Sequence, residues 1–144
     1  MAPLRQPRYD SPVRVFLSYH HKDADAAEVV RKSLERAGFD VWDPRTRLLP
    51  GEDWNKAVGE ALQSARAMIV LLSPEAVESP WMKREIAYAL GERRFEGRLV
   101  PVVVRPVSKV PWILAKLRVL RLAPNVKRGT RRIVEALKHR PSAA

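Results

Sequence analysis

The chain has 144 residues, a formal net charge of +11, and 46% hydrophobic and 30% charged residues. This length and composition are typical of one globular domain. The absence of cysteine excludes disulfides and thiolate metal sites, and the three histidines do not have zinc-ligand spacing, so we expect no metal. Apolar runs such as 67–72 are far shorter than the roughly 20 residues of a membrane span. We therefore expect a cytoplasmic protein without a membrane segment.

The positive charge is concentrated in the last third of the chain. Residues 1–97 contain 15 Lys/Arg and 15 Asp/Glu, whereas the residues from Arg98 onward contain 12 Lys/Arg and Glu135 as the one acidic residue. Such a region would attract nucleic acid or an acidic partner. A solubilising surface is the simpler interpretation, because Trp112 is the one aromatic residue among these cations and there is no series of aromatic residues interleaved with them.

The first half of the chain alternates strand and helix patterns. Residues 13–19 are β-branched and aromatic and predict a strand, and residues 23–37 have apolar positions at helical spacing, followed by Gly38. Asp23 stands where a side chain would cap this helix, and Trp54 is expected to pack on the inner face of a later one. The remaining predicted elements are a strand at 39–42, a loop at 43–53, a helix at 54–65 and a buried strand at 67–72.

The second half continues the alternation. Its predicted elements are a helix at 80–94, a strand at 99–104, a loop at 105–112, a fifth strand at 118–122 and a basic closing helix at 128–139. The strands are apolar runs rather than alternating patterns, which indicates a parallel α/β sheet covered by helices on both faces. We expect one domain at 12–139, with a flexible leader at 1–11 and a tail at 140–144.

In an open parallel sheet, ligands bind beyond the carboxyl ends of the strands. That rule groups residues 18–21, the loop at 43–53 and the residues from Ser73 onward around one crevice. The six glycines form neither a GxGxxG nor a P-loop motif, which disfavours a dehydrogenase or a P-loop NTPase. Ser18 lacks a GxSxG elbow, so hydrolase chemistry at a serine nucleophile is unsupported.

Three segments, in this order, resemble the TIR (Toll/interleukin-1 receptor) domain family. They are FLSYHHKD at 16–23, WDPRTRLLPGEDW at 42–54 and LLSPEAVESPWMKREIAYAL at 71–90. The resemblance covers about 12–137 and implies a flavodoxin-like five-stranded parallel sheet of order 2-1-3-4-5. The Phe-Trp pair of many animal members is absent, and Pro111-Trp112 stands near its place.

Some members of this family cleave NAD⁺ between nicotinamide and ribose, and in these a WxxxE motif carries an essential glutamate. The matching residues here are Trp81 and Glu85. Residues i and i+4 lie about 40° apart on one helical face, so both can face one pocket. Glu85 stands beside Ile86 of the inward apolar stripe, at the edge of the core. The resemblance implies NAD⁺ as substrate and no resident cofactor.

This chemistry is plausible with a single carboxylate. Hydrolysis of a neutral glycoside normally takes two, because the leaving oxygen must be protonated. Nicotinamide leaves from a cationic pyridinium and becomes neutral, so no general acid is required. Glu85 could then bind the ribose hydroxyls and stabilise the oxocarbenium-like transition state. Trp81 would stack on the nicotinamide ring.

The resemblance also assigns contacts outside the WxxxE motif. Tyr19, His20 and His21 correspond to strand-end residues that contact the nucleotide in NAD⁺-cleaving relatives. Asp43 is either a ligand for a ribose or adenine group or a turn former, and Gly51 belongs to the loop that opens the pocket. The other members of that loop are expected to contact a neighbouring molecule: Arg45, Arg47, Leu48 and Leu49.

Three functions remain open from the sequence. The first is an NAD⁺ nucleosidase or ADP-ribosyl cyclase, an effector in bacterial immunity or cell-death signalling that is activated by self-assembly, with either a linear or a cyclic product. The second is a non-catalytic scaffold that binds other TIR domains through the loop at 43–53. The third is a nucleic-acid-associated domain that uses the basic C-terminal third.

Overall fold

The computed structural model describes residues 13–44, 51 and 53–138. A parallel sheet of five strands, in the order β2-β1-β3-β4-β5, forms its centre, which confirms the predicted fold class. The strands are β1 Arg14–Ser18, β2 Asp40–Trp42, β3 Ala67–Leu72, β4 Leu99–Val103 and β5 Leu120–Arg121. The fifth strand is shorter than the predicted 118–122.

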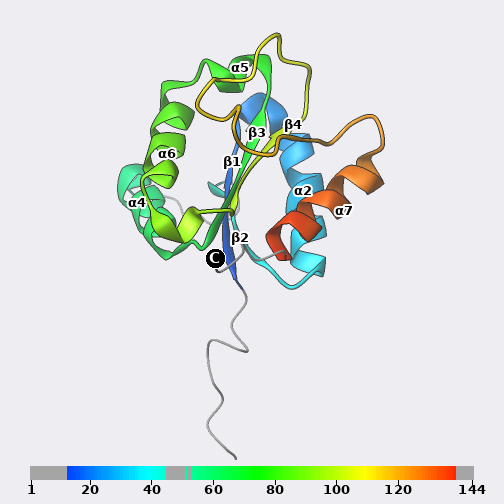
Figure 1. The fold of residues 1–144 in the computed structure, drawn as a ribbon. Helices are drawn as coiled ribbons and strands as arrows, with labels where there is room; N and C mark the ends of the chain where they lie inside the picture. The colour runs from blue at the N-terminus through cyan, green and yellow to red at the C-terminus, as the bar shows by residue number, and fades with distance from the viewer. Residues whose placement is uncertain (1–12, 45–50, 52, 139–144) are drawn as a thin grey trace, which may run out of the picture.

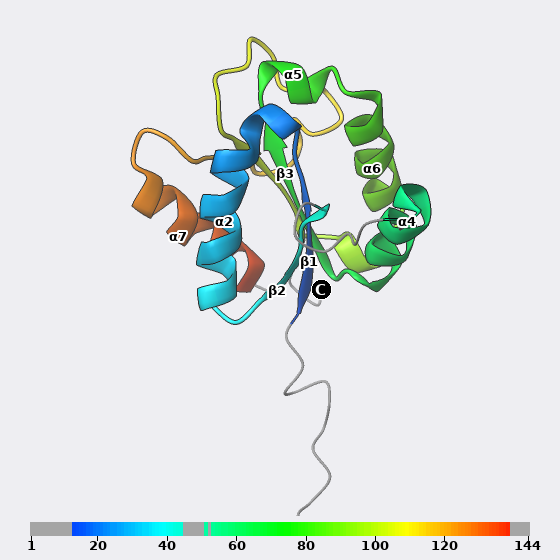
Figure 2. The ribbon, with the colours of Figure 1, turned by 180° about the vertical axis from the view of Figure 1, so that it is seen from behind.

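Helices cover both faces of the sheet. The longer ones are α2 Ala24–Arg36, α4 Trp54–Ser64, α6 Pro80–Leu90 and α7 Val126–Lys138. Figure 1 shows α2 and α7 on one face and α4 and α6 on the other, and Figure 2 shows the same two layers from behind. The short elements are η1 His21–Asp23, α5 Pro74–Val77 and η2 Arg93–Phe95. No helix of the described ranges is long and apolar enough to cross a bilayer.

Strand β3 divides the core into two layers. All six of its residues are buried. Met68, Val70 and Leu72 join the cluster beneath α4 and α6, whereas Ala67, Ile69 and Leu71 join the cluster beneath α2 and α7. Successive side chains of a strand point to opposite faces, so an uninterrupted apolar run is what a doubly covered strand requires.

Helix boundaries differ from the predictions at three places. The helix predicted for 80–94 ends at Leu90, and a separate turn, Arg93–Phe95, buries Phe95 in the core. Arg94 fixes that turn because its guanidinium donates to the carbonyls of Leu62 and Ala65 and to the Tyr88 hydroxyl. The closing helix begins at Val126 rather than 128. The four-residue helix α5 was not predicted, since it is too short to show periodicity.

Helix α7 approaches the sheet edge so closely that one position requires glycine. A Cβ at Gly129 would lie 2.6 Å from the carbonyl oxygen of Leu122 and 2.9 Å from that of Arg121. Those atoms are backbone and cannot rotate away. At Gly59, in α4, a Cβ would meet nothing within 4 Å. The two helical glycines therefore provide a matched comparison.

We predict that Gly129→Ala destabilises the protein and that Gly59→Ala stabilises it. Alanine gains about 1 kcal/mol over glycine in a helix interior, but forcing α7 away from the backbone of 121–122 costs about 1–3 kcal/mol. Chemical denaturation followed by far-UV circular dichroism measures both free energies of unfolding. Equal gains in the two variants would show that α7 is not closely packed at Gly129.

Candidate active site

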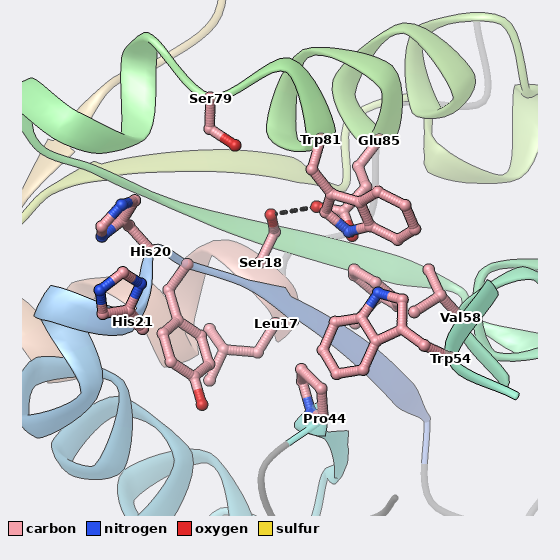
Figure 3. Close-up of a pocket in the computed structure, with 12 residues that line it drawn as sticks. Leu17, Ser18, His20, His21, Pro44, Trp54, Val58, Ser79, Trp81 and Glu85 are labelled. Atoms are coloured by element: carbon pink, nitrogen blue, oxygen red, sulfur yellow. Dashed lines mark hydrogen bonds between the residues drawn. The ribbon is translucent and has the colours of Figure 1, made fainter. Parts of the chain in front are cut away.

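A cavity of about 390 Å³ opens at the carboxyl end of β1. Its walls come from the end of β1, the residues that follow it, the beginning of α4 and the beginning of α6, as Figure 3 shows. Its lining residues are Phe16, Leu17, Ser18, Tyr19, His20, His21, Pro44, Trp54, Val58, Ser79, Trp81 and Glu85. Its size is within the range of small-molecule sites. Five of the predicted site residues line this cavity: Glu85, Trp81, Tyr19, His20 and His21.

Glu85 is buried at the wall of this cavity, with 6% of its surface exposed. Helix α6 begins after Ser79, whose hydroxyl accepts from the Met82 amide, so Glu85 is in its second turn. The Ser18 hydroxyl donates to Oε1 of Glu85, and the Trp81 indole Nε1 donates to Oε2 over 2.8 Å. Each carboxyl oxygen therefore has one protein donor.

The protonation of Glu85 depends on these surroundings. Burial raises the pKa of Glu85 from 4.5 to about 7, although the hydrogen bonds from Ser18 and Trp81 act in the opposite direction. Desolvation disfavours the charged form, whereas donors to the carboxylate favour it. A carboxyl group with this pKa changes its charge near neutral pH, which is characteristic of functional sites as well as of buried pairs.

Two indoles form the aromatic wall of the cavity. The ring centroids of Trp54 and Trp81 are 6.1 Å apart with an interplanar angle of 52°, a contact distance for aromatic pairs. We expected Trp54 to pack into the core, and this expectation is wrong, because 45% of its surface is exposed. Trp54 is the first residue of α4 and lies beside the cavity (Figure 3). Val58, one turn later on the same helix, is the residue that packs in the core.

The polar end of the cavity carries two imidazoles. The rings of His20 and His21 are 4.2 Å apart and tilted by 31°. Nδ1 of His20 accepts from the Lys22 amide over 3.1 Å, so the proton of the neutral ring resides on Nε2. Among the described residues, no lysine or arginine lines the cavity. An anionic ligand group would therefore meet imidazole and backbone donors there.

Other predicted site residues lie away from the cavity wall. Asp43 is 3% exposed and accepts from the Tyr19 hydroxyl over 2.6 Å, and its Oδ2 lies 3.8 Å from Nε of Arg31. It thus supports Tyr19 from behind and is not among the lining residues. Gly51 has a positive φ of 85° and is exposed, and it does not line the cavity either. The predicted contact residues Arg45, Arg47, Leu48 and Leu49 lie outside the described residues.

An ionic network with a buried carboxylate, that of Asp23, joins the loops at the same end of the sheet. Asp23 was expected to cap α2, but it makes no capping hydrogen bond. Its carboxylate instead accepts from the Ser73 hydroxyl and from Nε of Arg105, the latter over 2.7 Å. Arg105 also donates to Glu75, which lowers the pKa of Glu75 to about 2. The network ties together the residues that follow β1, β3 and β4.

Neither group of polar contacts was predicted from the sequence. Ser18 and Glu85 are 67 residues apart in the chain, and Asp23 and Arg105 are 82 apart. No local pattern signals such a pair. The rule that strand ends converge did place residues 18–21 and those after Ser73 at one edge, and it could have directed attention to Ser18 as a polar partner.

We predict that Glu85→Gln stabilises the folded protein above neutral pH. Glutamine has the same shape: its oxygen can accept from Trp81, and its amide can donate to the rotated Ser18 hydroxyl. Because the folded-state pKa of Glu85 is raised to about 7, wild-type stability falls as pH rises from 4.5 to 7 and stays lowered above that. This loss amounts to about 3 kcal/mol at most.

The measurement is the free energy of unfolding of both proteins at pH 5 and pH 8. The advantage of Glu85→Gln should be small at pH 5 and reach its maximum at pH 8. Glu78→Gln, at an exposed position just before α6, is the control and should show a difference that does not change with pH. A pH-independent difference for Glu85→Gln would contradict a raised pKa.

Comparison with known proteins gives relatives in several kingdoms. A protein of Actinoplanes sp. named NAD(+) hydrolase ApTIR is 32% identical over 105 residues, which are 67% of this chain and 14% of that protein. The stimulator of interferon genes protein of Magallana gigas is 28% identical over 135 residues, which are 90% of this chain and 32% of that protein. The chain thus spans about a third or less of the length of these relatives.

Solved structures show the same fold. The TIR-STING receptor from C. gigas in complex with 2′,3′-cGAMP superposes with a TM-score of 0.75 at 29% identity, over 95% of this chain and 42% of that one. The TIR domain of the Toll-related receptor TRR-2 of Hydra magnipapillata gives a TM-score of 0.73 at 20% identity, over 87% and 98% of the two chains. A family model described as TIR domain matches residues 15–135. The chain therefore belongs to the TIR domain family.

Proposed function

We propose that this TIR domain is an NAD⁺ nucleosidase that breaks the bond between nicotinamide and ribose. The observation that carries the proposal is the buried carboxyl group of Glu85, which Ser18 and Trp81 hold at the wall of the 390 Å³ cavity. The similarity to a relative named an NAD(+) hydrolase supports the same reaction. NAD⁺ is the substrate, and the reaction needs no resident cofactor.

In the proposed reaction, the bond between C1′ of the ribose and the nicotinamide nitrogen breaks. Its electron pair goes to the ring, which leaves as neutral nicotinamide, and positive charge develops on the ribose. An ionised Glu85 stabilises that charge in a site shielded from water. Water then adds to C1′ and loses a proton, giving ADP-ribose, or an adenine nitrogen attacks the same carbon, giving a cyclic isomer.

The hydrogen bonds of Glu85 are compatible with this role. An ionised carboxylate has about four lone-pair directions, and Ser18 and Trp81 use two of them. The others are free to accept from the ribose hydroxyls. A cationic nicotinamide ring close to Glu85 favours the ionised form, because an opposite charge lowers the pKa of a carboxyl group. Substrate binding therefore favours the ionised carboxylate of Glu85, which is the form that the reaction requires.

The walls of the cavity suit the nicotinamide ring and the pyrophosphate of the dinucleotide. The indole of Trp81 can stack on the cationic ring and contributes about 0.5–2 kcal/mol by a cation–π interaction, with its orientation fixed by the 2.8 Å bond to Glu85. His20 and His21 can donate to the pyrophosphate. We place this activity in bacterial immunity or cell-death signalling, where a depleted NAD⁺ pool is itself the signal.

A second candidate is a scaffold that binds other TIR domains without catalysis. One observation favours it: Trp112 is 79% exposed beside an apolar hollow of about 290 Å³. Leu72, Met82 and Ile86 also line that hollow. An exposed indole next to an apolar hollow is typical of an anchor for a protein partner.

We predict that Glu85→Gln lowers nicotinamide release from NAD⁺ at least a hundredfold, because the transition-state charge loses its partner. Quantification of nicotinamide by chromatography at pH 7.5 measures the rate. Glu78→Gln, which removes an exposed carboxylate near α6, should leave the rate unchanged. The wild-type kcat/KM, which reports the pKa of the free enzyme, should rise with pH through about 7 if ionised Glu85 is required.

Each result decides between the two candidates. If Glu85→Gln releases nicotinamide at the wild-type rate, the proposed site is wrong. If the wild-type protein releases none, even at high protein concentration, the scaffold is the better description.

We also predict that activity per molecule rises with protein concentration. Trp54 at the cavity wall leaves 45% of its surface exposed, and a second copy that covers it would exclude water from the site. The measurement is the initial rate over a hundredfold range of protein concentration, with and without a crowding polymer. A rate strictly proportional to concentration under both conditions would argue against activation by self-assembly.

A further inference from the structure

A continuous set of exposed cations covers helix α7 and the edge strand β5. We call it the basic α7 surface, and it consists of Arg118, Arg121, Lys127, Arg128, Arg131, Arg132 and Lys138. The ion pairs formed among the described residues use other cations: Arg14, Lys22, Arg31, Lys32, Arg94 and Arg105. The charge excess of the sequence lies in this third of the chain, and α7 carries five of these cations.

The cations of α7 form two rows along its exposed side. At 100° per residue, Lys127, Arg131 and Lys138 fall within an arc of about 40° and span about 17 Å of helix. Arg128 and Arg132 form the second row, and Glu135 stands between the two rows. The opposite side of the helix is buried and consists of Gly129, Ile133 and Leu137.

The surface continues from the helix to the sheet edge. Arg118 and Arg132 line one hollow of about 650 Å³, together with Leu120 and Glu135. Arg121 is exposed on β5, the last strand of the sheet. The cations therefore follow a path across two elements rather than a single helical stripe.

This arrangement works against the stability of α7. Its first turn contains Lys127 and Arg128 and no acidic residue, although the positive end of the helix dipole favours anions there. Lys127 and Arg131, and likewise Arg128 and Arg132, are like charges at i and i+4, which repel each other. An external polyanion would relieve both unfavourable interactions at once.

We propose that the basic α7 surface binds the phosphate backbone of double-stranded nucleic acid. Rows of unpaired cations suit a regularly charged polymer, whose counterions are released on binding. Neither α7 nor β5 contains an aromatic residue, so stacking on single-stranded bases has no platform there. Contact is to the backbone, so the binding is not sequence-specific.

Other partners fit this surface less well. A protein partner needs an apolar anchor at the centre of its interface, and Val126, at one end of α7, is the one exposed large apolar side chain that the described residues place on this helix. A helix that lies in a membrane surface must free its apolar face. In α7 that face is buried against the rest of the domain.

The surface lies on the other side of the sheet from the cavity. Helix α7 packs beside α2, whereas α4 and α6 carry the cavity residues Trp54 and Glu85 (Figures 1 and 2). A bound duplex would leave the cavity open. The inference is independent of the proposed NAD⁺ chemistry, because binding is measured without substrate.

The experiment measures binding of a 20-base-pair fluorescent DNA duplex by anisotropy between 50 and 200 mM salt. Neutralising about five phosphates predicts a slope of log K against log salt of about −4 to −5. Replacing Lys127, Arg128, Arg131 and Arg132 by alanine should reduce the slope by about 1 per cation and the affinity at 50 mM salt at least a hundredfold. These positions are exposed and form no ion pair with another described residue, so the variant should fold, with a melting temperature no lower than that of the wild type.

Two further variants make the test specific. The charge-matched control replaces the exposed cations Lys56, Arg66, Lys83 and Arg84 by alanine and should bind as the wild type does. The variant Arg128→Lys, Arg131→Lys, Arg132→Lys keeps the charge and should retain binding. Equal weakening in both alanine variants, a salt slope near zero, or binding to anionic lipid vesicles but not to the duplex would each overturn the proposal.

Discussion

The hydrogen bond from Ser18 to Glu85 connects the end of β1 with the second turn of α6, and Trp81, from the same helix as Glu85, donates to the other carboxyl oxygen. This contact joins segments 67 residues apart and sets the geometry of the whole cavity wall. A buried carboxyl group is costly unless it has donors, and these two donors offset part of that cost. The remainder appears as the raised pKa. The domain thus retains a group that opposes its own stability at the position where an electrostatic catalyst would be most effective.

The fold could be predicted from the sequence because the apolar residues recur at the spacing of a helix or form the continuous run of a buried strand. The apolar run of β3 predicted a strand covered on both sides, and the clusters on the two faces confirm it. The Trp81–Glu85 spacing predicted a shared face, and the 2.8 Å bond between the two side chains agrees with it. Both inferences use neighbours within one element, where geometry is fixed by the backbone alone.

Contacts between segments that are distant in the chain could not be predicted from such local patterns. Asp23 has the residue type and position of a helix cap, yet its buried carboxylate turns toward Arg105, because a charge-assisted hydrogen bond from a guanidinium is stronger than one from a backbone amide. Trp54 has the spacing of a core residue, but as the first residue of α4 it lines the cavity and leaves 45% of its surface exposed. In both positions the local pattern was correct, and the tertiary surroundings determined the side chain's role.

The network around Arg105 has a mechanical consequence. Asp23 ends the short turn that carries His21 of the cavity, and Arg105 begins the segment that carries Trp112 of the apolar hollow. The contact between the Arg105 guanidinium and the Asp23 carboxylate joins these two segments. One side chain therefore anchors a segment of the cavity and a segment of the hollow in the same folded arrangement.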